Sequence, residues 1–254
     1  MRLDQAVAAR FPDISRRKAR ELIAAGRVLV NQRPVRVASR FVAGSDQLAV
    51  AGDLPAIEVL ASGHDWIAVN KPAGVPVQPT RDRATMSLEE MLRVEHGEIL
   101  LVHRLDTPTS GVVLFARTGD AAARFSGLFA SGAIRKTYLA VIGGTIEGET
   151  TIDAPIDGKE ALTIVRPLRG SLVEVEIKTG RTHQIRVHLA SIGHPVAGDR
   201  RYGGPSAPRL MLHAWKLRHE LIGEIEAPIP PELSDRWPGG ASPPPVAPES
   251  PRGE

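Results

Sequence analysis

The chain has 254 residues and carries 32 basic against 29 acidic side chains, which gives a net charge of +3. This length suits one fair-sized domain plus a smaller unit, and 42% hydrophobic with 24% charged residues excludes wholesale disorder and a membrane span. The lack of cysteine excludes disulfide bonds, thiolate zinc sites, iron–sulfur clusters and a cysteine nucleophile. The first residues lack the apolar segment of a signal peptide, so we expect a cytoplasmic protein.

Residues 1–50 combine a helical pattern with a hairpin pattern. The apolar spacing from Leu3 to Phe11 predicts a first helix, and Ser15 can cap a second helix that ends at Gly26. Short apolar runs separated by turn residues then predict a small antiparallel sheet. The expected strands and turn are Val28–Val30, Asn31–Gln32, Val35–Val37 and Gln47–Val50.

The second predicted helix begins with a cluster of cations. The helix dipole disfavours positive charge at this end, so an anionic partner explains the cluster better than a solvated helix face does. The segment also resembles the small alpha-L RNA-binding domain of many ribosome-associated proteins, over Ser15–Ile23 and Gly26–Asn31. We therefore expect residues 1–50 to bind RNA through Arg16, Arg17, Lys18 and Arg20.

Composition marks the limits of a second domain. Residues 51–56 are predicted to be a linker because they contain Gly, Asp and Pro. The chain then resumes with a strand at Trp66–Val69, so we place the second domain at residues 57–233. Residues 238–254 hold six prolines among Gly, Ser and Ala, a composition that cannot bury enough apolar surface to fold. We predict a disordered tail there.

A nine-residue polar loop precedes the apolar run Val112–Ala116. The loop contains the cation Arg104, the carboxylate Asp106 and three hydroxyl groups, while Pro108 and Gly111 restrict its path. A loop that merely turns the chain does not need this density of functional groups. The pattern therefore favours a reactive site.

A second group of polar residues follows the alternating strand Val173–Lys178. The pattern predicts an amphipathic helix over Arg181–Ile192. His183 and His188 lack the His-Glu-x-x-His spacing of zinc sites, so we expect structural histidines and no metal. Away from the apolar stripe of this helix, the spacing aligns Arg181, Gln184 and His188.

Together, these residues resemble the pseudouridine synthases of the large-subunit ribosomal and tRNA type that carry the His-Arg-Leu-Asp motif. Several ordered motifs carry the resemblance across residues 57–233. They are Asn70–Gly74, His103–Asp106 with Thr109–Gly111, Lys136–Ala140, Thr179–Leu189, Gly193–Asp199 with Tyr202–Gly203, and Leu212–Ala214. The resemblance implies an α+β fold in which the N-terminal helices and hairpin precede a mixed, largely antiparallel sheet.

The resemblance also implies an enzyme that isomerises specific uridines of structured RNA to pseudouridine. Large-subunit ribosomal RNA is the expected substrate, and tRNA is the alternative. Asp106 would act either as the nucleophile at the anomeric carbon or as the base that removes the ribose 2′ proton. Arg181 would keep Asp106 ionised. Tyr138 would stack on the target base and help to remove the ring-carbon proton.

Four further residues complete the implied site. Arg104 would occupy the space that the flipped uridine leaves, and Leu189 would form the apolar wall of the pocket. Gln184 and Arg186 would hold the flanking RNA backbone. The isomerisation needs no net oxidation, hydrolysis or energy input, so no cofactor is implied. We expect a monomer whose partner is RNA.

Two other functions stay open as alternatives. A non-catalytic RNA-binding or ribosome-assembly protein would keep the fold, although every polar position of the motifs is filled here. An aspartate-based hydrolase of nucleosides or glycans would need a second carboxylate as proton donor. No such acid stands out near Asp106, whereas Arg104 and Arg181 do.

Overall fold

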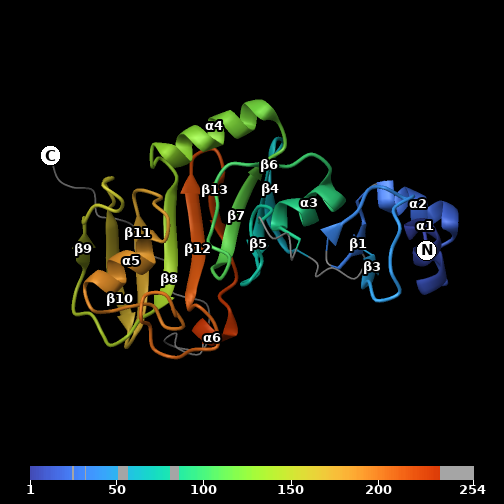
Figure 1. Cartoon of the computed structure of the whole chain (residues 1–254). Helices are drawn as coiled ribbons and strands as arrows, with labels where there is room; N and C mark the ends of the chain where they lie inside the picture. The colour runs from blue at the N-terminus through green and yellow to red at the C-terminus, as the bar shows by residue number, and fades with distance from the viewer. Residues whose placement is uncertain (25, 32, 51–56, 81–85, 235–254) are drawn as a thin grey trace.

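The computed structural model describes residues 1–24, 26–31, 33–50, 57–80 and 86–234. The expected linker at 51–56 and the expected Pro-rich tail at 238–254 lie outside the described residues. Figure 1 shows a small N-terminal unit and a larger unit built on one broad sheet.

The N-terminal unit consists of two helices and a small sheet. Its elements are α1 (Leu3–Arg10), α2 (Arg16–Ala24), β1 (Val28–Val30), β2 (Arg33–Pro34) and β3 (Leu48–Val50). The strands are antiparallel in the order β2-β1-β3. Ser15 caps α2, because its Oγ accepts the N–H of Lys18 at 3.2 Å. The fully buried side chains of Leu3, Val7 and Ile23 join the helices to the sheet in one core.

The return strand of the hairpin begins earlier than predicted. We expected it at Val35–Val37, whereas β2 begins at Arg33, which pairs with Val30. Asn31 has a left-handed backbone, with a φ of 51°. A left-handed residue is typical of tight hairpin turns, which allow the pairing of the strands to resume soon after it.

The larger unit is built on a ten-stranded mixed sheet. Its strands are β4 (Val59–Ser62), β5 (Trp66–Lys71), β6 (Leu100–Leu101), β7 (Ser110–Ala116), β8 (Arg135–Val141), β9 (Thr150–Ile152), β10 (Thr163–Arg169), β11 (Leu172–Ile177), β12 (Leu212–His219) and β13 (Gly223–Glu226). The main order is β4-β5-β7-β12-β8-β11-β10-β9, with β6 paired to β7 and β13 to β12. Among the described strands, β7 and β12 form a parallel pair and the other pairs are antiparallel. The predicted α+β class is confirmed.

Helices cover parts of this sheet, as Figure 1 shows. They are α3 (Leu88–His96), α4 (Gly119–Ala130), α5 (Gln184–Ser191) and the short α6 (Pro231–Ser234). α4 packs against β6 and β7, and α5 packs against β10. Thr118 begins α4, since its hydroxyl accepts the N–H of Ala121 at 3.2 Å.

Gly111 allows β7 and β12 to meet in the middle of the sheet. It has a φ of 116°, and a Cβ at this position would lie 2.1 Å from the carbonyl oxygen of Ala214. Only glycine permits such a close approach of two backbones. The loop that carries Asp106 is therefore anchored where it enters the central strand.

Candidate active site

A cavity of about 440 Å³ is lined by the loop before β7, by β8, and by the segment that joins β11 to α5. These segments are distant in the sequence: Asp106 and the Arg186 that it contacts are 80 positions apart. Six of the residues that the sequence assigned to the site line the cavity, namely Arg104, Asp106, Tyr138, Arg181, Gln184 and Arg186. Their roles in a reaction stay predictions.

Asp106 is paired with Arg186, not with Arg181. Nη1 of Arg186 donates to Oδ2 of Asp106 at 3.0 Å, and Nε2 of His183 lies 3.6 Å from the same oxygen. Arg181 instead directs its Nε to the carbonyl oxygen of Glu160 at 2.8 Å. The predicted ion pair between Arg181 and Asp106 is thus absent from the part of the chain that the structure describes.

The start of α5 explains why Asp106 pairs with Arg186 and not with Arg181. We predicted a helix from Arg181, whereas α5 begins at Gln184, because His183 has a left-handed φ of 56° that cannot continue a helix. Oε1 of Gln184 accepts the N–H of Arg181 at 3.0 Å and the hydroxyl of Thr179 at 2.7 Å. Gln184 is 2% exposed, so its amide holds this turn, where the sequence suggested a contact with RNA.

Asp199 fixes the guanidinium of Arg186 from the other side. Nε and Nη2 of Arg186 donate to its two carboxylate oxygens at 2.6 and 2.9 Å. Asp199 is buried and also accepts the N–H groups of Arg201 and Tyr202. Although burial acts in the opposite direction, Arg186 lowers the pKa of Asp199. Because Arg186 serves both Asp199 and Asp106, it is occupied within the protein and is not free for the RNA backbone.

Lys71 ties the loop of Asp106 to the neighbouring strand. Its buried Nζ donates to the carbonyl oxygens of Pro72, Val75 and Thr107, at 2.9, 2.7 and 3.0 Å. Burial lowers the pKa of Lys71 to about 7, against an opposing effect of Asp106. The sequence did not indicate this role, because the acceptors are backbone carbonyls of two separate loops. The contact with Thr107 fixes the residue that follows the carboxylate.

Tyr138 lies on β8 and lines the cavity. Burial, reinforced by the charge of Asp106, raises its pKa, so its phenol is protonated at neutral pH. The expected stacking on a base remains a prediction. Removal of a ring-carbon proton would require the phenol to lose its own proton first, which this environment opposes.

The apolar wall of the cavity differs from the prediction. Leu189 is fully buried in the hydrophobic core, while Leu105, Ile185 and Leu212 line the cavity. Ile185 precedes Leu189 by one helical turn on the same face of α5. The first turn of the helix therefore meets the cavity, and the next turn is covered by the core. Arg104 is exposed and also lines the cavity.

His183 and His188 make hydrogen bonds within the protein. His188 contacts Thr163 Oγ1 at 2.8 Å and the carbonyl oxygen of Ala154 at 2.9 Å, and His183 Nδ1 lies 2.9 Å from the hydroxyl of Tyr202. The described ranges contain no group of three or more His, Asp or Glu side chains that could hold a metal ion.

Within the same ranges, the helices are too short or too polar to span a membrane.

The cations of α2 have anions within the chain. Arg16 and Arg20 place their Nε atoms 2.9 and 2.8 Å from a carboxylate oxygen of Asp4. Despite its burial, these arginines lower the pKa of Asp4 to about 2. Arg17 and Lys18 are 91% and 59% exposed and lie 3.9 and 3.5 Å from a carboxylate of the same helix. Two of the four cations therefore neutralise a buried acid, and the other two face solvent.

Comparisons with known proteins agree with both units. The family described as RNA pseudouridylate synthase matches residues 65–191, and the S4 domain matches residues 1–48. An uncharacterized RNA pseudouridine synthase of Bacillus subtilis, YhcT, is 34% identical over 75% of this chain and 74% of its own. Ribosomal large subunit pseudouridine synthase D of Escherichia coli K12 is 32% identical over 91% of this chain and 88% of its own. The structure of human RNA pseudouridylate synthase domain containing 1 has a TM-score of 0.62 at 29% identity and covers 72% of this chain and 88% of its own.

Proposed function

Because the chain belongs to the RNA pseudouridylate synthase family, we propose that it isomerises specific uridines of large-subunit ribosomal RNA to pseudouridine. The observation that carries the proposal is a carboxylate, Asp106, held by Arg186 in the wall of a cavity of about 440 Å³. Relatives named as acting on the large ribosomal subunit match over most of this chain. They support ribosomal RNA over tRNA as the substrate.

The chemistry requires an ionised carboxylate at the ribose. The bond from ribose C1′ to the uracil N1 must break, the base must turn, and a new bond must form from C1′ to C5. Asp106 can attack C1′ or remove the 2′ proton, and both routes need its charged form. Arg186 donates a hydrogen bond to Oδ2 of Asp106 at 3.0 Å and so holds the carboxylate in one orientation. Lys71 and Gly111 keep the loop in place while the substrate changes.

The target uridine must leave its stack to reach Asp106. Flipping a base costs on the order of a few kcal/mol. Contacts between the flipped base and the cavity must offset this free-energy cost. Tyr138 and the exposed Arg104 both line the cavity; Tyr138 would stack on the base, and Arg104 would fill the gap left in the RNA. Arg181, whose Nε contacts the carbonyl oxygen of Glu160, is assigned to substrate positioning at the cavity.

The S4 domain provides a second RNA contact outside the cavity. We assign residues 1–50 to it, residues 51–56 to a linker and residues 57–233 to the catalytic domain. Its exposed Arg17 and Lys18 can meet phosphates, and such contacts strengthen binding without reading sequence. RNA loops are recognised by shape and by unstacked bases, so this domain would select a structured region. We infer that the enzyme acts as a monomer in the cytoplasm.

The test combines a deletion strain with purified protein. Pseudouridine is mapped at nucleotide resolution in ribosomal RNA and tRNA from strains with and without the gene, and the missing sites are then restored in vitro with the purified chain. We expect at least one site in large-subunit RNA to depend on the protein and on Asp106. Sites only in tRNA would reassign the substrate, and no dependent site in either RNA would refute the activity.

A further inference from the structure

Lys136 brings an ammonium group to the cavity wall, and none of the residues that the structure describes pairs it with an anion. The residue is 5% exposed and lines the cavity together with Tyr138, two positions later on β8. Side chains two positions apart on a strand point to the same face of a sheet. Within the ranges that the structure describes, Lys136 makes no hydrogen bond or ion pair.

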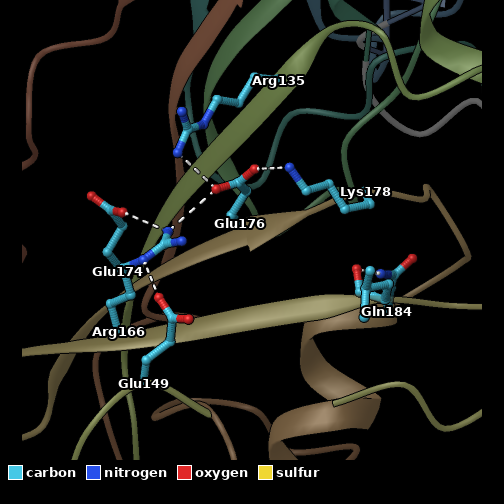
Figure 2. Close-up of polar contacts among 8 residues, drawn as sticks. Arg135, Glu149, Arg166, Glu174, Glu176, Lys178 and Gln184 are labelled. Carbon is cyan, nitrogen blue, oxygen red and sulfur yellow. Dashed lines mark hydrogen bonds and ion pairs between the residues drawn. The ribbon is translucent and has the colours of Figure 1, made fainter. Parts of the chain in front are cut away.

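The charges on the opposite face of these strands are paired. Figure 2 shows Glu176 in contact with Lys178 and with Arg135, whose Nη2 lies 2.9 Å from the carboxylate. Arg166 Nη1 links Glu176 to Glu174 at 3.2 and 3.3 Å. These cations are therefore neutralised by acids of the same sheet. Lys136 alternates with Arg135 along β8 and does not take part in this network.

Lys136 is 5% exposed and meets solvent only through the cavity. An ammonium that has lost most of its hydration without gaining a counter-charge destabilises the folded state. Burial, reinforced by the charge of Lys178, lowers the pKa of Lys136. A methionine of similar length would fill the same space in a purely structural wall without this cost. The presence of lysine therefore points to negative charge that enters the cavity as part of a ligand.

The register of β8 places Lys136 relative to the reacting carboxylate. Tyr138 is opposite Ala214 of β12, beside the start of β7 and the Asp106 loop. Lys136 lies two positions before Tyr138 on β8 and close to His103, since its charge contributes to the low pKa of that histidine. A uracil ring stacked on Tyr138 with its ribose at Asp106 would direct its far edge toward Lys136.

We propose that Lys136 binds a carbonyl oxygen of the target uracil and stabilises the negative charge that the ring acquires when it leaves the ribose. The proposal rests on the proposed function, because it assigns a step of that reaction. It makes Lys136 a catalytic residue whose main contribution is realised during bond cleavage. Preorganised charge in a site that excludes water is suited to this task.

The electron balance of the isomerisation explains why one cation suffices. When the C1′–N1 bond breaks, its electron pair stays on the ring and is shared by N1, O2 and O4. A half-turn about the axis through N3 and C6 exchanges N1 with C5 and O2 with O4. The C1′–C5 bond then forms with a ring electron pair, C5 loses its proton, and N1 gains one. Lys136 can therefore contact one carbonyl oxygen before the turn and the other after it.

A phosphate is the other anion of a nucleotide, and burial argues against it here. Each phosphate of the target joins it to flanking nucleotides, which cannot enter a cavity of about 440 Å³. Phosphates would therefore stay outside the cavity, within reach of solvent-exposed cations such as Arg104, which also lines the cavity. The deeply buried position of Lys136 suits the base.

The test compares Lys136→Met with Lys178→Met. Both remove one lysine charge, but Lys178 belongs to the paired network and does not line the cavity. For each variant, we would measure the single-turnover rate of pseudouridine formation on the RNA identified for the parent, its affinity and its thermal midpoint. We expect Lys136→Met to slow the reaction by about 100-fold or more, with affinity within about threefold and an equal or higher midpoint. Lys178→Met should keep the parent rate.

Other results would overturn the proposal. An unchanged rate in Lys136→Met removes the catalytic role, and a lowered thermal midpoint with partial unfolding indicates a structural lysine. A loss of affinity that disappears when a neutral methylphosphonate replaces the target phosphate would identify a phosphate contact instead. If Lys136→Met does not fold, Lys136→Gln keeps a hydrogen-bond donor and should retain more activity than Lys136→Ala. If the parent itself isomerises no uridine, the proposed function fails, independently of any variant.

Discussion

Arg186 and Asp106 form the central ion pair of the cavity, with Nη1 of the arginine 3.0 Å from Oδ2 of the aspartate. The same guanidinium makes a two-point contact with the buried Asp199. An arginine fixed in this way cannot rotate toward solvent, so it holds Asp106 in one orientation. The pair thus links the loop before β7 to α5.

The first prediction concerns the carboxylate itself. Asp106→Asn should reduce isomerisation by about 10⁴-fold, because an amide is neither a nucleophile nor a base here. RNA affinity should be kept, since a carboxylate contributes little attraction to a polyanion. Pseudouridine formation and filter-binding affinity on the same RNA test both parts. Activity within tenfold of the parent in a folded variant would refute the assignment.

The second prediction separates the two arginines of the cavity. Arg186→Lys should slow the reaction by about 10-fold to 100-fold, because an ammonium cannot hold Asp106 and Asp199 together and a displacement near 1 Å is costly. Arg181→Lys should have a smaller effect on the rate, since Arg181 contacts a backbone carbonyl and not Asp106. The single-turnover rates of the two variants test which substitution slows the reaction more. A larger loss in Arg181→Lys would show that the two arginines exchange roles when RNA binds.

The third prediction divides the cations of α2 into two pairs. Changing Arg17 and Lys18 to alanine should weaken RNA binding and lower the log–log salt slope by about 0.7 to 0.9 for each lost phosphate contact. The thermal midpoint should not change, because both side chains are exposed. Changing Arg16 and Arg20 to alanine should lower the midpoint as well, since it removes two of the three arginines that pair with the buried Asp4 and leaves only Arg2.

Salt-dependent binding curves and thermal unfolding of the full chain distinguish these effects. If the Arg17 and Lys18 variant binds like the parent at every salt concentration, the exposed part of α2 is only a solvated surface. RNA recognition would then belong to the larger unit.

The fourth prediction is a pH dependence caused by His103. Its Nε2 accepts the N–H of Leu114 at 2.9 Å, and burial together with the charge of Lys136 lowers its pKa from 6.5 to about 3. Between these values the unfolded chain binds a proton that the folded protein does not. The free energy of unfolding should therefore fall as the pH drops below 6.5, by up to about 1.4 kcal/mol per pH unit.

Urea unfolding at a series of pH values tests this prediction. His103→Gln keeps an acceptor for the N–H of Leu114 and does not titrate, so its stability should vary less with pH than that of the parent. The buried His213, whose pKa is lowered to about 4, should account for part of the remaining slope. Equal slopes in parent and variant would show that His103 is not the titrating group.

Local patterns were sufficient for much of the fold. The strand at Trp66–Val69 is the first part of β5, the apolar run Val112–Ala116 is the body of β7, and Ser15 caps α2 as predicted. Alternation and capping depend on neighbouring residues, so a single sequence reveals them. The sequence placed Arg181 on one helix face with Gln184 and His188, but Arg181 lies outside the helix. The left-handed His183 makes α5 begin at Gln184, and nothing in the helical spacing marks His183 as a break.

The sequence by itself determined the family, the two folded units and the reactive loop, because motifs and periodicity are local properties of the chain. Only the tertiary structure decided which arginine meets Asp106, which leucine faces the cavity and which lysines are paired. Each of these depends on segments far apart in the sequence, such as the turn before α5 that directs Arg186 inward and Arg181 toward Glu160. Charge pairing is a property of distance in space, and it separates the buried Lys136 of β8 from Lys178, which follows β11 and pairs with Glu176.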